Sequence, residues 1–245
     1  MSYADEAAKN WQALQKNEYP GRGIVLGITN ARSLKTEISW LMGRSENSRN
    51  RDYIREEKGL VRTAYADPSK GGDPSLVIYN AMREGAYGNF VVSNGDQTDD
   101  AVVVRGVNDF YTAMRKREYE PDDPNFTPRI TGIMTCSAGD PMAVIAIHRK
   151  APHGTACIRS FYEYPDIAKG FGYCVHTYQG NAPEGKPLPS FEGDPYLLPI
   201  IGISAEEIAD SYWPRLNAEN RVALVVKTID SVGEIEIAIR NASKI

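Results

Sequence analysis

The sequence predicts an α+β fold in which two mainly antiparallel sheets stack and helices cover their outer faces. Three observations support this prediction: the helical patterns are few and segregated, the strand patterns follow one another as antiparallel strands would, and there are enough strands for two sheets. No linker divides the 245 residues. We therefore expect one domain spanning residues 1–245.

The first half of the chain opens with an amphipathic helix and continues with short strands. Residues 4–16 place Ala7, Trp11 and Leu14 on one helical face. Short apolar runs typical of strands follow at 24–29, 37–43, 60–65, 76–80 and 89–92. Residues 96–117 are predicted to form one helix, capped by Asp96 or Thr98 and interrupted in pattern by Gly106.

The second half is rich in strand patterns. We expect strands at 130–136, 142–148, 156–162 and 172–178, and a closing hairpin of 221–229 with 233–239. Residues 180–200 contain too many Pro and Gly residues for regular structure and are predicted to form a long loop. A helix capped by Ser204 is expected to end before Pro214.

Composition favours a cytoplasmic protein. The 28 Lys and Arg residues against 32 Asp and Glu residues give a net charge of -4, which does not favour nucleic acid or an anionic membrane. No apolar run reaches the roughly 20 residues of a membrane span, and the first residues are polar and acidic. Three widely spaced cysteines are expected to be buried free thiols: Cys136, Cys157 and Cys174.

Several familiar signatures fail on their context. Gly180–Lys186 has the spacing of a phosphate-binding P-loop, but Pro187 occupies the position of the magnesium-binding Ser or Thr. Gly21–Gly27 misses the dinucleotide-binding spacing and precedes a strand instead of following one. The three histidines fall on separate elements, so we expect no metal site: His148, His153 and His176.

The polar run Ser93–Asp99 directly follows the predicted strand at 89–92. It concentrates side chains that can hydrogen-bond a polar ligand at the end of a strand. Alternatively, Asn94 and Gly95 merely supply the backbone geometry of a turn. The run by itself leaves both readings open.

A set of motifs becomes distinctive in combination. In order, they are Tyr19–Ile24, Arg44–Ser45 with Arg49 and Arg51, Tyr79–Asn80, Val91–Asp99, Tyr119–Glu120 and Thr127–Ile130. This order resembles the archaeal-type inosine monophosphate (IMP) cyclohydrolase family. The resemblance covers most of residues 19–150, and it is much weaker beyond them.

The resemblance implies a fold, a reaction and partners. The fold would be a four-layer αββα sandwich like that of the N-terminal-nucleophile hydrolases. The reaction would close the ring of 5-formamidoimidazole-4-carboxamide ribotide to give IMP and water, the last step of de novo purine biosynthesis, without a cofactor, in a homo-oligomer. Ser2 precedes a helix and not a strand, which argues against amide hydrolysis by a terminal nucleophile.

The resemblance assigns catalysis to Tyr79, Glu120 and Arg44. Glu120 is the preferred proton-transfer group, because burial can tune its pKa. Tyr79 could donate to the formyl oxygen, or it could be a core tyrosine. Arg44 could bind the phosphate or stabilise charge on the formyl oxygen. Other acids near Glu120 are possible substitutes: Glu118, Asp122 and Asp123.

Four arginines are candidates for substrate binding. Arg49 and Arg51 compete for one basic position, because the loop exceeds the family's length and the register is uncertain by about two residues. Arg22 could reach the same pocket or form a structural salt bridge. Arg129 could bind phosphate or pair with Glu120.

Four uncharged polar residues complete the expected substrate site. Asn80 and Asn94 could recognise a carboxamide, with turn formation the alternative for Asn94. Thr98 is an expected contact by its position in the motif, and Thr127 is held extended by the proline that follows it.

Two other functions compete with ring closure. The chain could bind a purine ribotide without catalysis, or it could act on a related ribotide. Convergence of Tyr79, Asn80 and Glu120 on one cavity with Arg44 would support catalysis, and absence of the first three from the pocket would support the binding function.

Overall fold

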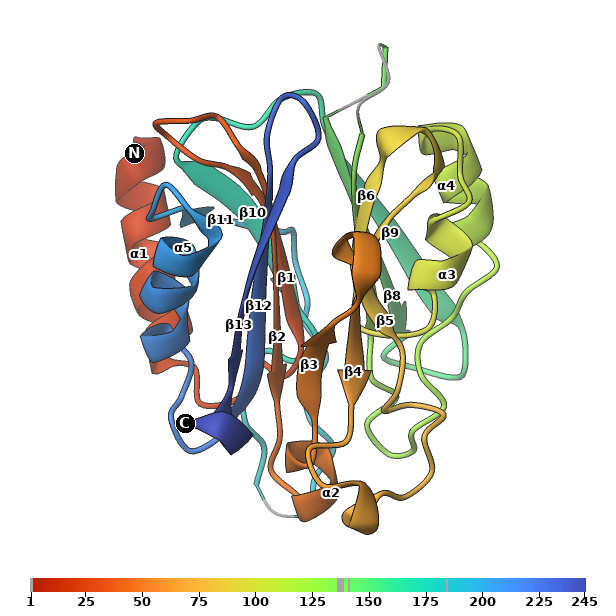
Figure 1. The fold of residues 1–245 in the computed structure, drawn as a ribbon. Coiled ribbons are helices and arrows are strands. Elements are labelled where there is room, and N and C mark those ends of the chain that lie inside the picture. Colours follow the sequence, from red (N-terminus) through yellow and green to blue (C-terminus); the bar gives the residue numbers. More distant parts are fainter. Residues whose placement is uncertain (1, 136–138, 141, 184) are drawn as a thin grey trace.

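The computed structural model describes residues 2–135, 139–140, 142–183 and 185–245. Two mainly antiparallel sheets stack face to face, and helices cover the outer face of each, which confirms the predicted α+β sandwich (Figure 1). Helices α1 and α5 lie on one side, and α3 and α4 lie on the other. The four layers follow from the need of each sheet to bury both of its faces.

The first sheet has the strand order β11-β10-β1-β2-β12-β13. Its outer face packs against α1 and α5 through Trp11, Leu14, Trp40 and Tyr212. Ser204 caps α5 as predicted, and Ser2 caps α1. The elements are β1 (Gly23–Ile28), β2 (Lys35–Met42), β10 (Phe171–His176), β11 (Tyr196–Pro199), β12 (Arg221–Ile229), β13 (Ile235–Asn241), α1 (Tyr3–Lys16) and α5 (Ala205–Tyr212).

The second sheet runs β3-β4-β5-β6-β7-β8-β9 in chain order, so each described strand pairs with its sequence neighbours. Its outer face packs against α3 and α4 through Ala101, Phe110 and Met114. The elements are β3 (Asp52–Arg55), β4 (Val61–Ala64), β5 (Asn80–Glu84), β6 (Phe90–Ser93), β7 (Arg129–Met134), β8 (Ala143–Lys150), β9 (Cys157–Tyr164), α3 (Thr98–Ala101) and α4 (Val107–Met114). A further short helix, α2 (Glu46–Arg49), links β2 to β3.

The main core lies between the two sheets. Ile24 and Leu26 of β1 meet Val92 of β6 and Ile130 of β7 in this layer. Because β1 pairs with both β2 and β10, its whole length is buried. This placement fixes the residues that precede β1, Tyr19 to Arg22, at one end of the sandwich.

Three predictions about local structure were wrong. The helix expected over 96–117 is two helices, because Gly106 adopts an extended conformation and the Asp140 carboxylate accepts a hydrogen bond from the Val107 amide. The loop expected over 180–200 contains β11, an edge strand that pairs only with β10 among the described strands and therefore tolerates Pro199.

The strand expected at 76–80 is displaced. Residues 80–84 form β5 instead, and a turn precedes them, with the Val77 and Ile78 amides bonded to the Pro74 carbonyl. Strand β3 was not predicted, because its four residues include Asp52 and Arg55. Its acidic start is stabilised by Ser243, whose hydroxyl donates to Asp52 at 2.6 Å.

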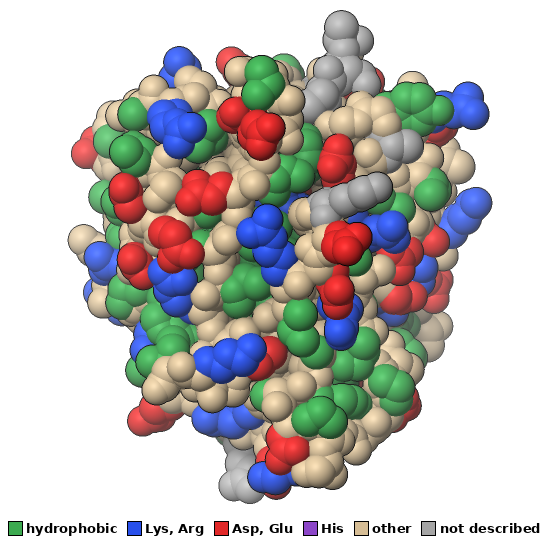
Figure 2. Space-filling model, viewed as in Figure 1, with side chains coloured by type: hydrophobic (Ala, Val, Ile, Leu, Met, Phe, Trp, Pro, Cys, Tyr) green, Lys and Arg blue, Asp and Glu red, His purple; other side chains and the backbone are tan. Residues whose placement is uncertain are grey.

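The surface fits the composition, and Cys174 but not Cys157 is as buried as predicted. Acidic and basic side chains are interspersed over the face shown in Figure 2. Among the described residues, no helix is both long and apolar enough to cross a membrane. Cys174 is a buried free thiol and Cys157 is a half-buried one, whereas Cys136 lies outside the described residues.

Candidate functional site

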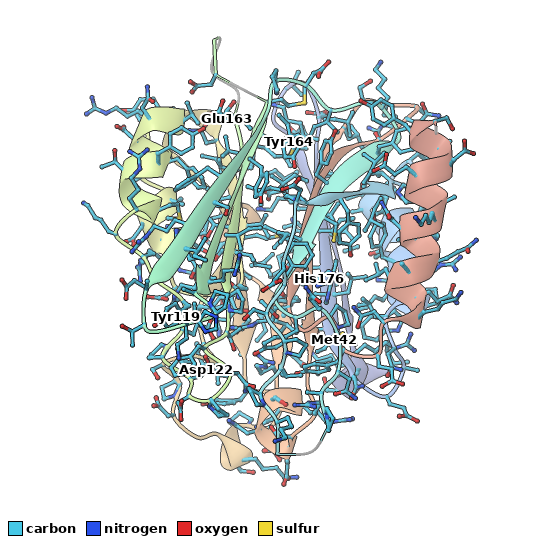
Figure 3. The ribbon with its side chains drawn as sticks, turned by 180° about the vertical axis from the view of Figure 1, so that it is seen from behind. Met42, Tyr119, Asp122, Glu163, Tyr164 and His176 are labelled. Carbon is cyan, nitrogen blue, oxygen red and sulfur yellow. The ribbon has the colours of Figure 1, made fainter. Side chains whose placement is uncertain are left out.

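A polar pocket of about 370 Å³ lies at the end of the sandwich where α2 is found. Its walls come from the chain before β1, the end of β2 with the following loop, residues 120–127, and the chain after β10. Met42, at the end of β2, and Asp122, in the loop before β7, lie at this end of the molecule (Figure 3). The volume falls within the roughly 300–1,000 Å³ of small-molecule sites.

A buried ion pair forms part of the pocket wall. Nη1 of Arg22 donates to Glu120 Oε1 at 2.8 Å, and Nη2 donates to Oε2 at 2.6 Å. Arg22 also donates to the Asn94 carbonyl at 2.9 Å. Burial raises the pKa of Glu120, and the charge of Arg22 opposes that rise. The carboxylate is therefore fixed in direction at the pocket wall.

Tyr79 and Arg51 accompany this pair. Burial raises the pKa of Tyr79, and the positive charges of Arg22 and Arg51 oppose the rise. The Tyr79 hydroxyl is buried and makes no hydrogen bond within the described part of the chain. Tyr79 is not among the residues that line the pocket surface, so it stands just behind the wall as a neutral phenol with an uncommitted proton.

Arg51 lines the pocket, and it also fastens the loop after β2. Its Nε donates to the Ser48 carbonyl at 2.9 Å, and its Nη2 donates to the Met42 carbonyl at 3.1 Å. Burial lowers the pKa of Arg51. These two bonds hold the guanidinium in place and place a fixed positive charge beside the cavity.

A chain of hydroxyl groups forms another wall. The Thr127 hydroxyl donates to Asp122 Oδ2 and also contacts the Tyr178 hydroxyl. Because the single proton of Thr127 goes to Asp122, the Tyr178 hydroxyl must be the donor to Thr127. The Thr127 amide adds a bond of 2.6 Å to Asp122 Oδ1. This chain holds all three side chains in one arrangement.

Arg44 stands at the mouth of the pocket. Its guanidinium lies over the Tyr19 ring, 5.0 Å from the ring centre, and Tyr19 stacks on Tyr178. Its Nη1 donates to Asn181 Oδ1 at 2.7 Å. Polar side chains of the α2 region complete this rim: Ser45, Asn47 and Ser48.

The Ser93–Asp99 run lies outside the pocket lining and forms hydrogen bonds within the protein. Asn94 uses its side chain within the protein: Nδ2 donates to the Pro128 carbonyl at 2.8 Å, and Oδ1 accepts from the Ile130 amide at 2.9 Å. The Thr98 hydroxyl donates to the Gly95 carbonyl at 3.2 Å. Neither side chain lines the pocket.

Gly95 allows the charged side chains behind the pocket to approach the backbone. A Cβ at this position would lie 2.6 Å from Arg129 Nη1 and 3.5 Å from Glu120 Oε1. Arg129 pairs with Asp96 at 2.6 Å and with Gln97 at 2.7 Å, so its partner is not Glu120. The run therefore positions Arg22 and Arg129 through backbone and carboxylate contacts.

The structure brings some predicted site residues together and not others. Five line the pocket: Arg22, Arg44, Arg51, Glu120 and Thr127. Arg49 is exposed, and its Nη2 donates to Asn220 Oδ1 at 3.5 Å. Asn80 donates to Asp99 at 2.9 Å, away from the pocket. Of the two arginines that compete for one position, Arg51 is the one at the cavity.

Sequence reasoning missed Tyr19 and Tyr178 as pocket residues. Tyr178 comes after residue 150, where no motif marks it. The pairing of Gly23 with His176 carries Tyr178 past the start of β1 and beside Arg22. Only this register could have identified Tyr178.

Acidic and histidine side chains of the described residues are not arranged to hold a metal ion. Within the described ranges, no group of three or more His, Cys, Asp or Glu side chains could hold one. The chemistry open to the site on its own residues is proton transfer and anion binding.

Comparison with known proteins identifies one family. The family model described as "IMP cyclohydrolase-like protein" matches residues 19–233. The matched range includes every residue that lines the pocket. A comparison with curated proteins gave no match.

Proposed function

The chain belongs to the IMP cyclohydrolase-like family, as the order of its motifs predicted, and on this premise we propose that it closes the ring of 5-formamidoimidazole-4-carboxamide ribotide to IMP. The carboxamide nitrogen attacks the formyl carbon of the same molecule, a carbinolamine forms, and water leaves. Because the step is intramolecular, holding the two groups in contact supplies several kcal/mol.

Glu120 is the proposed proton-transfer group. The carboxamide nitrogen loses one proton and the formamido nitrogen loses one, and the formyl oxygen gains both and departs as water. A carboxylate that takes a proton from nitrogen and returns it to oxygen accounts for this balance. The two bonds from Arg22 fix the direction of Glu120 and leave further lone pairs on both oxygens.

Tyr79 is the proposed donor to the formyl oxygen. Its hydroxyl has no partner among the described residues, and burial keeps the phenol protonated near neutral pH. A small shift of the pocket wall, or one bridging water, would carry its proton to a ligand. Arg22 and Arg51 beside it would stabilise negative charge that develops on that oxygen.

Arg44 and Arg51 are the proposed contacts for the 5′-phosphate. Both line the pocket, and the hydroxyls of Ser45 and Ser48 lie on the same side. Guanidinium groups match phosphate oxygens in geometry as well as charge. Arg49 is left out of this assignment because its side chain is exposed outside the pocket.

The observation that carries the proposal is the buried Glu120 carboxylate, which accepts two hydrogen bonds from Arg22. It borders a polar cavity that Arg44 and Arg51 also line. A protein that only binds a ribotide has no need for a buried carboxylate fixed at the cavity wall. Asn80 lies outside the pocket and Tyr79 lies behind its wall, so the support for catalysis comes from Glu120 and Arg44.

The test is direct turnover. Purified protein incubated with the formamido ribotide should form IMP, followed by its ultraviolet absorbance, with no added metal or folate. Absence of turnover at micromolar enzyme, with IMP still bound, would leave a binding protein and overturn the cyclohydrolase proposal.

A further inference from the structure

A second pocket lies between α1 and the chain that leads into β11. It has a volume of about 370 Å³ and shares no lining residue with the pocket that contains Glu120. Asn10, Leu14 and Asn17 of the α1 side face His176 and residues 191–196 across it. Figure 3 shows His176 at the middle of the molecule on the side of α1. We call this cavity the α1 pocket.

Three aromatic rings form one corner of the α1 pocket. The His176 ring meets Phe191 edge-on at 4.8 Å and Tyr196 edge-on at 5.6 Å, measured between ring centres. Phe191 and Tyr196 are 6.4 Å apart. Grouped rings of this kind offer π faces that attract an organic cation.

His176 presents a hydrogen-bond acceptor to the cavity. Its Nδ1 lies 2.8 Å from the Tyr178 carbonyl, which can only accept, so Nδ1 carries the proton. Nε2 is then a bare acceptor, and it has no hydrogen-bond partner among the described residues. The residue is 5% exposed, and burial lowers its pKa to about 4, so the ring is neutral at physiological pH.

The remaining polar groups favour a positive ligand. Glu192 and Asp194 line the pocket, and no Lys or Arg does. Glu192 also forms an ion pair with Arg149, at 3.8 Å. Asn10 and Asn17 each donate one amide N–H to a backbone carbonyl, that of Leu197 and that of Gln179 respectively. The last turn of α1 adds the negative end of a helix dipole.

We propose that the α1 pocket is a second binding site, and that its ligand is an organic ammonium ion bearing an aromatic or alkyl group. The ammonium group meets Glu192, Asp194 and His176 Nε2, and the apolar group packs against Phe191, Tyr196 and Leu14. This site does not depend on the ring-closing function, since the two pockets are lined by different residues.

The test uses phenethylammonium as the probe and phenylacetate as its anionic counterpart. Imidazole signals are followed by NMR, which is practical because the chain has 3 histidines. Phenethylammonium should shift the His176 signal saturably, with through-space contacts to the Phe191 and Tyr196 rings. Phenylacetate should bind at least about tenfold more weakly. Equal binding of the two probes, or no shift at His176 up to tens of millimolar, overturns the proposal.

Variants at exposed positions keep the test independent of folding. Glu192→Gln with Asp194→Asn should weaken phenethylammonium binding by about threefold or more, the effect of losing exposed charge pairs. The matched control, Glu219→Gln with Glu234→Gln, alters two exposed carboxylates elsewhere and should leave the affinity unchanged. Equal affinity of both double variants and the natural protein would contradict the charge recognition proposed here.

Discussion

Two ion pairs are buried among the residues that the structure describes, and they differ in almost every other respect. Arg22 and Glu120 share two hydrogen bonds of 2.8 and 2.6 Å beside an open cavity. Lys227 and Glu37 face each other across β12 and β2 with a single contact of 3.4 Å, and both side chains are fully buried. Neither the Lys227 ammonium nor the Glu37 oxygens make a hydrogen bond in the described part of the structure.

The surroundings explain the difference. Val225 and Ile229, on the same side of β12 as Lys227, belong to the core between the sheets, so the pair is sealed from solvent. Burial raises the pKa of Glu37 and lowers the pKa of Lys227, which opposes both charges. Burial of charge alone therefore does not mark a reactive site; the pair must also border space that a ligand can occupy.

The largest expected effect is on the stability contributed by Lys227 and Glu37, which we call the sealed pair. Lys227→Ala leaves the Glu37 carboxylate buried without a counter-charge and should lower the free energy of unfolding by about 3–5 kcal/mol. Urea denaturation measures this change. Lys169→Ala, at an exposed lysine, is the control and should stay within about 0.5 kcal/mol. A loss below about 1 kcal/mol for Lys227→Ala would show that the pair is not charged in the folded protein.

The next effect is on kcat, and it is expected without a loss in the free energy of unfolding when Tyr79 is replaced. Tyr79→Phe removes a hydroxyl that has no hydrogen-bond partner in the described structure, so the free energy of unfolding should be unchanged or higher. If the phenol donates its proton to the substrate, kcat should fall by roughly 10²-fold. Steady-state kinetics and denaturation of the same preparation give both quantities. Unchanged kcat would remove Tyr79 from the mechanism.

A smaller effect distinguishes two neighbouring arginines. Arg51→Ala removes a buried guanidinium from the pocket and should raise KM by about tenfold, whereas Arg49→Ala removes an exposed one and should change KM by less than about twofold. Equal effects of the two substitutions would contradict the placement of the phosphate near Arg51.

The smallest effect is expected when both members of the sealed pair are replaced. Glu37→Leu with Lys227→Met exchanges the two charges for apolar groups of similar size, which often is neutral or stabilising. The free energy of unfolding should stay within about 1 kcal/mol of the natural protein or exceed it. A loss as large as that of Lys227→Ala would show that the pair contributes a specific interaction to the fold.

The sequence predicts the layers of this fold well, because hydrophobic periodicity marks most strands and the helices at both ends. The prediction from sequence fails where contacts with distant parts of the chain override the local hydrophobic pattern. The periodic residues of 96–117 continue through Gly106, but the extended glycine and Asp140, brought in from the β7–β8 connection, divide the helix. Strand β11 forms because β10 offers it an edge, and no signal within its proline-rich segment shows that.

The candidate site also contains some residues that the sequence could identify and others that it could not. Glu120, Arg44 and Thr127 could be chosen from motifs, but the pairing of Glu120 with Arg22 joins residues 98 positions apart and depends on the stacking of two sheets. Arg51 could not be separated from Arg49 by sequence, because a shift of two residues in the loop exchanges them. Asn94 and Thr98 have the right chemistry for a ligand, yet the turn they build consumes their hydrogen bonds.

The most direct measurement compares the two buried pairs in the reaction itself. The initial rate of IMP formation from saturating formamido ribotide is measured for Glu120→Gln and for the double variant Glu37→Leu with Lys227→Met. The pocket pair should matter to chemistry and the sealed pair should not, so Glu120→Gln should lose about 10²-fold or more in rate while the double variant retains the natural rate. Comparable rates for the two variants would contradict the assignment of the reaction to the Arg22–Glu120 pocket.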